Sequence, residues 1–334
     1  MGEVLAATWT NLLSPMVLFF VLGFVAALVR SDLSVPRELT AGLALYLMMA
    51  IGFRGGSELA HHGLSLAALG AVAAGLALGV VIPCIAYLIL TRLGRLDPVN
   101  AGAIAAHYGS ISAVTFATAT GFLQGLGVPY RGFMVTVMAL MEAPGVITGI
   151  LLARVALARE GEENADGPGL GSLGSVVRET FASGSSLLLL GSFAVGLATG
   201  DRGMALVKPF AVDLFPGALS FFLLDLGLTA ARRLHEFLHL GRFLAAFALA
   251  MPVVGGSLGI AAARLVGLGV GEATLLATLA ASASYIAAPA AVRMALPRAN
   301  PALSITLSLG ITFPFNVMVG IPLYYALAQV LVGR

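Results

Sequence analysis

The sequence predicts an all-α polytopic membrane protein with ten transmembrane helices in two inverted five-helix repeats. The first observation is composition: of 334 residues, 59% are hydrophobic and only 10% are charged, and the mean hydropathy is +0.99. A soluble domain carries about 25% charged residues. This chain cannot cover itself with a polar surface, so lipid must be its solvent. The other two observations are ten hydrophobic segments and a weak internal repeat.

Each hydrophobic segment has roughly the 17–25 residues that a membrane-spanning helix requires. The segments lie near 13–30, 38–59, 64–91, 99–123, 131–158, 183–200, 211–231, 242–266, 272–295 and 302–332. The fourth and the ninth are the least regular, because both are rich in Gly, Ala and Ser. We therefore expect these two helices to be broken near the membrane midplane.

The internal repeat is clearest at these two irregular segments. Residues 105–113 align without a gap on residues 280–288, 175 positions later. The same offset places residues 51–53 on residues 226–228. Any two helices rich in Ala and Gly resemble each other, but the recurrence of one offset favours a true repeat. Repeats that place paired broken helices at membrane depth are typical of secondary transporters.

The repeats are expected over residues 1–160 and 181–334, joined by a polar, Gly-rich linker at 161–180. An odd number of spans per repeat inserts the second repeat upside down. Loops on the side of the linker hold 12 of the 18 Lys and Arg residues. The positive-inside rule then puts the linker in the cytoplasm and both termini outside. We expect a multi-pass protein of the bacterial inner membrane.

The two irregular stretches predict a site for a small anion. Glycine relaxes the backbone, and hydroxyl groups satisfy the N–H and C=O groups that a broken helix frees. A half-helix that begins there points its first N–H groups and the positive end of its dipole at the midplane. Alternatively, these small residues only pack helices together. The candidate substrate-binding residues are Gly109, Ser110, Ile111, Ser112, Ser284, Tyr285, Ile286 and Ala287.

Glu142 predicts a cation-linked role, because a carboxylate deep in an apolar segment is expensive and is retained for function. It could also be a protonated structural acid. Pro144 is expected to break that helix and free carbonyl groups, and the approximate repeat mate lies near 312–316, with Pro and polar oxygens. The candidate cation ligands are Ser112, Thr115, Glu142, Ser282 and Ser284.

Other polar residues favour structural roles. Arg54 and Asp225 are expected near helix ends or paired with each other, and His107 as a packed, hydrogen-bonded side chain rather than a proton carrier. The sequence lacks the metalloprotease, phosphate-loop and nucleophile-elbow motifs. It also lacks a basic run with interleaved aromatic residues. We therefore expect no enzyme, no cofactor and no nucleic-acid partner.

Three stretches resemble the sodium-dependent bicarbonate permease family (SbtA-like), of which this chain would be a divergent member. They are Tyr108-Gly109-Ser110-Ile111-Ser112, Met141-Glu142-Ala143-Pro144 and Ala280 to Pro289, the last continuing through Arg293, Pro297 and Ala299-Asn300-Pro301. The resemblance covers nearly the whole chain in segment order. The portion from Arg293 to Pro301 is the most distinctive.

The resemblance implies a scaffold domain at about 13–59 and 183–231 and a mobile core domain at about 64–158 and 242–332. It implies sodium-coupled bicarbonate uptake by an elevator-type movement, with sodium as the coupling ion. It also implies a trimer and a nitrogen-regulator-like partner on the cytoplasmic face. On this basis Gly109, Ser110, Ser112, Ser282 and Ser284 would line the bicarbonate and sodium sites, with Glu142 nearby.

One departure from the family pattern keeps alternatives open. Tyr285 stands where family members commonly carry an acidic residue, and a tyrosine cannot supply a fixed negative charge to a sodium ion. The first alternative is a sodium- or proton-coupled transporter of a small organic acid, with Glu142 or His107 carrying the proton. The second is a membrane receptor or structural subunit that transports nothing.

Overall fold

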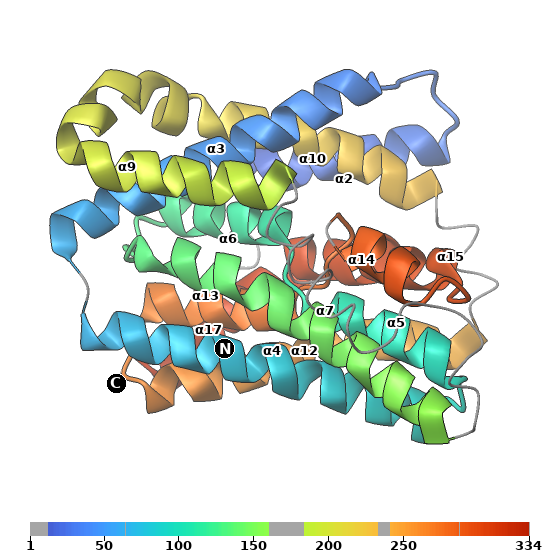
Figure 1. Cartoon of the computed structure of the whole chain (residues 1–334). Helices are drawn as coiled ribbons and strands as arrows, with labels where there is room; N and C mark the ends of the chain where they lie inside the picture. Colours follow the sequence, from blue (N-terminus) through green and yellow to red (C-terminus); the bar gives the residue numbers. More distant parts are fainter. Residues whose placement is uncertain (1–12, 64, 160–183, 233–240, 287, 334) are drawn as a thin grey trace.

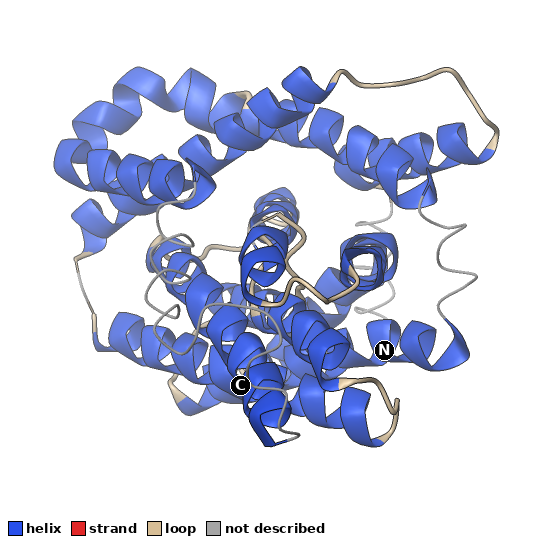
Figure 2. Ribbon diagram, turned by 45° about the vertical axis from the view of Figure 1, so that its right-hand side comes forward, coloured by secondary structure: helices blue, strands red, loops and turns tan. Residues whose placement is uncertain are grey.

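The computed structural model describes residues 13–63, 65–159, 184–232, 241–286 and 288–333, which form helices and loops without a strand (Figure 2). The predicted linker at 161–180 lies outside these residues. In chain order the elements are α2 (Pro15–Leu28), α3 (Arg37–His62), α4 (Leu66–Arg92), α5 (Pro98–Gly109), α6 (Ala113–Gly125), α7 (Phe133–Arg159), α9 (Gly184–Lys208), η2 (Pro209–Asp213), α10 (Phe215–Arg232), α12 (Gly241–Leu265), α13 (Val270–Ala281), α14 (Ala288–Ala295), α15 (Pro301–Ile305), η3 (Thr306–Thr312), α16 (Phe313–Phe315), η4 (Asn316–Gly320) and α17 (Ile321–Leu331).

The helices lie in two layers (Figure 1). The first layer contains α2, α3, α9, η2 and α10, and the second contains the remaining helices, with α4 and α12 farthest from the first layer. The short helices α5, α6, α13 and α14 belong to the second layer. The division into two sequence repeats stays a prediction, and the layers are the observed unit of packing.

The first layer is held by glycines at which two helix backbones touch. A side chain at Gly23 of α2 would overlap the backbone carbonyl of Leu224 in α10, and Gly227 of α10 meets α2 in the same way. Gly56 and Gly196 make the corresponding contact between α3 and α9. Small residues let membrane helices approach this closely, so packing replaces the missing hydrophobic driving force.

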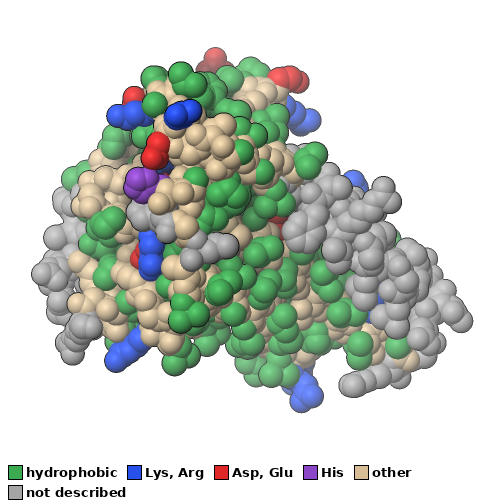
Figure 3. Space-filling model, turned by 60° about the vertical axis from the view of Figure 1, so that its left-hand side comes forward, with side chains coloured by type: hydrophobic (Ala, Val, Ile, Leu, Met, Phe, Trp, Pro, Cys, Tyr) green, Lys and Arg blue, Asp and Glu red, His purple; other side chains and the backbone are tan. Residues whose placement is uncertain are grey.

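Six helical stretches among the described residues are long and apolar enough to cross a membrane. They are 37–61, 66–92, 133–158, 187–232, 241–265 and 301–331. In Figure 3, charged side chains are sparse on one face of the molecule and broad hydrophobic areas separate them. These features are those of a polytopic membrane protein. The number of ten crossings stays a prediction.

Arg54 and Asp225, expected near helix ends or paired with each other, are not paired. The Thr40 hydroxyl, near the start of α3, donates a hydrogen bond of 2.9 Å to the Asp225 carboxylate. Arg54 lies near the opposite end of α3. The Arg54 and Asp225 side chains therefore lie at different heights along α3, and the expected pairing of these two charges was wrong.

Candidate functional site

The first irregular stretch interrupts the helical chain between α5 and α6. Helix α5 ends at Gly109, and α6 begins at Ala113 after the non-helical residues Ser110 to Ser112. The Ser112 side chain caps α6 by accepting a hydrogen bond of 3.2 Å from the Thr115 backbone amide. Serine is a favoured N-cap because its oxygen satisfies an amide that has no helical acceptor. The start of α6 therefore lies inside the protein, halfway along the predicted span.

The second irregular stretch interrupts the chain between α13 and α14. Helix α13 ends at Ala281, and α14 begins at Ala288. The Ser284 hydroxyl accepts a hydrogen bond of 3.2 Å from the Ala288 amide. Pro289 follows in the first turn, where a missing N–H costs nothing. Tyr285 is half-buried, Ile286 is 49% exposed, and Ala287 lies outside the described residues.

The two interruptions contact each other, and we call residues 107–112 together with 282–286 the crossing. The Ser112 amide donates a hydrogen bond of 2.9 Å to the Ser282 hydroxyl. The Ser284 amide donates one of 2.8 Å to the His107 carbonyl. The chain thus brings together stretches 175 positions apart in the sequence. The N-termini of α6 and α14 therefore both lie beside the crossing.

Two hydroxyl groups of the crossing lack a hydrogen-bond partner among the described residues. They are Ser110 Oγ and the Tyr285 hydroxyl, both buried. The Ser112 side chain neighbours the Tyr285 hydroxyl, but no hydrogen bond of regular geometry joins them. Ser110 and Tyr285 occupy equivalent positions in the 175-residue repeat. A buried hydroxyl without a partner costs about 1–3 kcal/mol, so two at equivalent positions point to a ligand that both could bind.

Helix α7 supports the crossing through a contact that the sequence analysis missed. A Cβ atom on Gly145 would lie 2.5 Å from the Ser110 amide nitrogen and would overlap the Gly109 carbonyl. A Cβ atom on Gly109 would in turn lie 2.8 Å from Gly145 Cα and 2.7 Å from Pro83 Cγ. Gly109 is therefore a close-packing residue. A glycine within an apolar segment was the only signal in the sequence for Gly145.

The expected break at Pro144 is wrong, because α7 runs without interruption from Phe133 to Arg159. Proline removes one backbone donor, and neighbouring helices can compensate within a membrane protein. Here a Cβ atom at Gly79 of α4 would lie 3.2 Å from Pro144 Cβ, so the two helices pack closely at this point. Glu142 lies one turn before Gly145 on the same helix and is half-buried.

The candidate cation ligands are divided among the crossing, α6 and α7. The oxygens of Ser112, Ser282 and Ser284 each accept a backbone hydrogen bond. Each retains a second lone pair. Thr115 is buried in the first turn of α6. No group of three His, Cys, Asp or Glu side chains suited to a metal ion occurs among the described residues. Sodium ligation by these residues stays a prediction.

Asn316 braces the second interruption from behind. Its side-chain amide donates a hydrogen bond of 2.9 Å to the carbonyl of Ala281, the last residue of α13. Its oxygen accepts one of 3.0 Å from the Tyr324 hydroxyl, and the side chain is fully buried. Asn316 begins η4, one of two π-helical stretches that follow α15. Such stretches are frequent at functional sites. The sequence indicated polar oxygens and a proline here, and the bracing contact required the structure.

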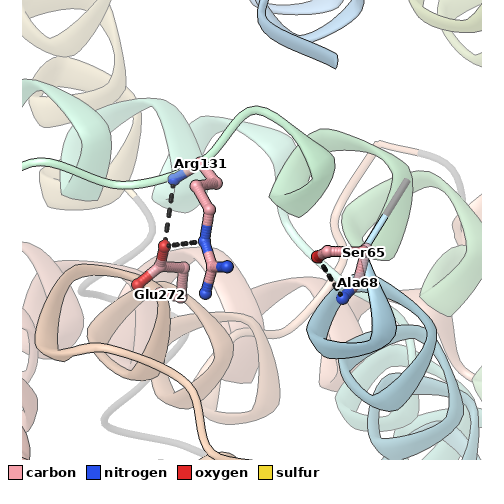
Figure 4. Close-up of polar contacts among 4 residues, drawn as sticks. All are labelled: Ser65, Ala68, Arg131 and Glu272. Carbon is pink, nitrogen blue, oxygen red and sulfur yellow. Dashed lines mark hydrogen bonds and ion pairs between the residues drawn. The ribbon is translucent and has the colours of Figure 1, made fainter. Parts of the chain in front are cut away.

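The starts of α5 and α13 are each tied to the other half of the chain. Glu272 at the start of α13 forms an ion pair of 2.7 Å with Arg131 Nε and also accepts from the Arg131 amide (Figure 4). At the start of α5, the Asn300 amide donates a hydrogen bond of 2.8 Å to the Asn100 side chain. The same view shows Ser65 capping α4 at Ala68. Both broken helices are thus fixed at their outer ends as well as at the crossing.

His107 is packed and hydrogen-bonded. It is 1% exposed, and its Nδ1 atom lies 2.8 Å from the Ala103 carbonyl oxygen. Its own carbonyl accepts from Ser284, as described above. Nε2 has no partner among the described residues. The residue thus contributes its backbone to the crossing.

Comparison of the sequence with models of known protein families shows the family to which the chain belongs. Residues 15–329 match the family described as the Na+-dependent bicarbonate transporter superfamily. The chain belongs to this superfamily. A search of curated proteins gives no match. The resemblance found in the sequence is therefore confirmed over nearly the whole chain.

Membership of the Na+-dependent bicarbonate transporter superfamily gives the class of the protein and of its substrates. Bicarbonate and Na+ are the substrates that fit this superfamily. The apolar helices and the family together indicate a multi-pass membrane protein.

Proposed function

We propose that the protein imports bicarbonate together with sodium by an elevator-type mechanism. The observation that carries the proposal is the crossing, where α6 and α14 begin beside two buried hydroxyls that have no hydrogen-bond partner among the described residues. Membership of the Na+-dependent bicarbonate transporter superfamily supplies the substrate and the coupling ion. The anion would lie between Ser110 and Tyr285, in reach of donors from both halves of the chain.

The chemistry of bicarbonate suits these donors. Its oxygens accept hydrogen bonds from hydroxyl and backbone N–H groups, and the positive end of a helix dipole favours its charge. Sodium would bind beside it through the second lone pairs of Ser112, Ser282 and Ser284, with Thr115 and Glu142 nearby. A cation bound first would raise the affinity for the anion, and linkage requires the reverse effect to be equal. Each ion would then favour the binding of the other.

The two layers support an elevator-type movement of the second layer against the first. One contact between them near the crossing is aromatic: Phe313 packs edge-on against Phe20 of α2 at a centroid distance of 5.8 Å. Within its own layer, Phe313 packs edge-on against Tyr285 at 5.5 Å. Aromatic contacts of this kind are worth about 0.5–1.5 kcal/mol each beyond burial. A surface of this kind could slide without breaking a buried ion pair. Assembly as a trimer and docking of a nitrogen-regulator-like partner stay predictions.

Uptake into proteoliposomes tests the function. Labelled bicarbonate is supplied outside, with an inward sodium gradient or with the same concentration of choline. We expect accumulation above the passive level only with the sodium gradient. Absence of accumulation under both conditions, with the protein folded and inserted, would refute bicarbonate as the substrate. Equal accumulation with sodium and with choline would refute sodium coupling.

A small carboxylate is the second candidate substrate, and the neutrality of the crossing favours it. Apart from the His107 ring, which lies against the Ala103 carbonyl, the side chains there that donate or accept hydrogen bonds are hydroxyls, and Tyr285 adds no fixed charge. Such a site has no group that selects bicarbonate over formate or acetate. Competition by these carboxylates against labelled bicarbonate, with pH and sodium varied separately, distinguishes the candidates. Inhibition by formate at concentrations below those of bicarbonate, together with dependence on pH alone, would favour the second.

A further inference from the structure

A large cavity lies between the two layers at the end of the molecule that is predicted to face outside. Its volume is about 910 Å³. The wall from the first layer comes from α3, α9 and η2, and the wall from the second layer comes from the loop before α7 and the start of α13. Three cationic side chains line it, Arg54, Arg131 and Lys208, together with the acids Glu58, Asp201 and Glu272.

A narrow crevice continues from this cavity towards the crossing. Arg54, Glu58 and Tyr130 line both spaces. The inner wall of the crevice includes Phe116 and Thr120 of α6. The Phe116 amide donates a hydrogen bond of 3.0 Å to the Ser112 carbonyl, so the crevice ends one helical turn from the crossing. Arg54 therefore lies where a wide outer space narrows towards the candidate site.

The charge of Arg54 is compensated differently from that of Arg131. Glu272 neutralises Arg131 through an ion pair of 2.7 Å. No carboxylate lies within ion-pair distance of Arg54 among the described residues. Its partners are neutral: the Gln124 amide, oriented so that its oxygen is 2.9 Å from Nη1, and the face of the Phe215 ring, with Cζ 5.8 Å from its centroid.

The neutral partners of Arg54 leave its guanidinium group able to bind an anion. Neutral dipoles hold the group in place, and among the described residues no carboxylate pairs with it directly, although Glu58 lines the same crevice. A half-buried charge without a directly bound counter-charge attracts one. The planar fork of arginine matches a carboxylate or bicarbonate through two parallel hydrogen bonds. Arg54 belongs to the first layer and Gln124 to the second. An arriving anion can replace the Gln124 oxygen without breaking an ion pair.

We propose that Arg54 is an anion access site, where a small planar oxyanion binds before it passes along the crevice to the crossing. The destination rests on the proposed function, whereas the binding at Arg54 rests on the cavity and on the neutral partners of the guanidinium. Arg54 would thereby select anions over cations at the constriction. Lys208, Asp201 and Glu272 line only the outer cavity and would not, whereas Glu58, which lines the crevice too, would oppose the selection.

Charge-selective labelling tests the proposal without transport. Cys84 is the only cysteine and is exposed, so the experiment uses a Cys84→Ser background in lipid nanodiscs. Thr120→Cys reports on the crevice and Met204→Cys on the outer cavity. Each is labelled with an anionic and with a cationic methanethiosulfonate reagent. We expect the anionic-to-cationic rate ratio at position 120 to exceed that at position 204 by about tenfold.

Variants of Arg54 then decide the origin of the ratio. Arg54→Gln should lower the ratio at position 120 by about tenfold. Arg54→Lys should keep it within about threefold because it retains the charge. Lys208→Gln is the matched control on the same cavity and should leave the labelling ratio at position 120 within about twofold of its unsubstituted value. An unchanged ratio in Arg54→Gln would overturn the proposal, and so would reaction at position 204 with none at position 120.

The labelling result and the transport result can fail separately. If the wild-type protein does not accumulate bicarbonate but the ratio depends on Arg54, the proposed function is wrong and the access site stands. If bicarbonate accumulates but the ratio is independent of Arg54, the function stands and the access site is wrong. A competing anion adds a direct check, since formate should slow anionic labelling at position 120 more in the wild-type background than in Arg54→Gln.

Discussion

Gly145→Ala should damage the crossing through one methyl group. The added Cβ atom would lie 2.5 Å from the Ser110 amide nitrogen, and ordinary contacts begin near 3.4 Å. The two helix backbones must therefore separate by about 0.9 Å or more, and the overlap with the Gly109 carbonyl demands at least as much. Because α5 ends at this point, the shift displaces Ser110 relative to the start of α6.

The size of the effect follows from this displacement. Overpacking of a close contact costs about 1–3 kcal/mol, and the higher helix propensity of alanine recovers about 1 kcal/mol of that. The net loss of stability is therefore modest. The loss of function should be larger, because a misplacement of about 1 Å at a site can cost about a hundredfold.

Two assays separate these effects. The thermal unfolding temperature of the purified variant in detergent should fall by a few degrees. The rate of sodium-driven uptake of labelled bicarbonate should fall by about a hundredfold. Gly191→Ala is the control, since nothing lies within 4 Å of its added Cβ in α9. It should leave uptake intact. Normal uptake by Gly145→Ala would refute the argument that contact with α7 positions the crossing.

Two further substitutions test the braces of the broken helices. Glu272→Gln should lower stability by about 1–3 kcal/mol because Arg131 is left without its carboxylate. The control is Asp201→Asn, at an exposed pair, which should cost less than about 0.5 kcal/mol. Equal effects of the two substitutions on thermal unfolding would contradict the role of Glu272 as a brace. Asn316→Leu should cost about 1–3 kcal/mol because it leaves the Ala281 carbonyl without its donor. An unchanged unfolding temperature and unchanged bicarbonate uptake would show that the brace is dispensable.

The sequence predicted the membrane character and the places where the helices break, and both depend on local composition. Runs of apolar residues identify helices of spanning length whatever lies around them. The stretches at Ser110 and Ser284 carry small and hydroxylated residues, which satisfy freed backbone groups wherever the chain leaves a helix. The repeat then made it possible to expect that these two stretches meet.

Contacts between distant side chains could not be predicted in this way. The ion pair of Arg131 with Glu272 joins residues 141 positions apart, and no pattern within either segment requires it. The close approach at Gly145 depends on how α7 crosses α5. The break expected at Pro144 was wrong for the same reason, because packing against α4 decides whether a proline interrupts the helix.

The most direct test of the account is the concentration dependence of bicarbonate uptake in Ser110→Ala and Ser304→Ala. Both hydroxyls are buried and without a partner among the described residues, but only Ser110 lies at the crossing. Neither substitution removes a hydrogen bond among the described residues, and each removes a buried hydroxyl without a partner, so both variants should fold with equal or higher stability. Loss of a hydrogen bond to an anion costs about 1.5–3 kcal/mol, or roughly ten- to hundredfold.

We predict that Ser110→Ala raises the KM for bicarbonate by about ten- to hundredfold and that Ser304→Ala leaves it unchanged. Tyr285→Phe, which keeps the ring against Phe313, should behave like Ser110→Ala. A wild-type KM in both Ser110→Ala and Tyr285→Phe would show that the transported anion does not bind at the crossing.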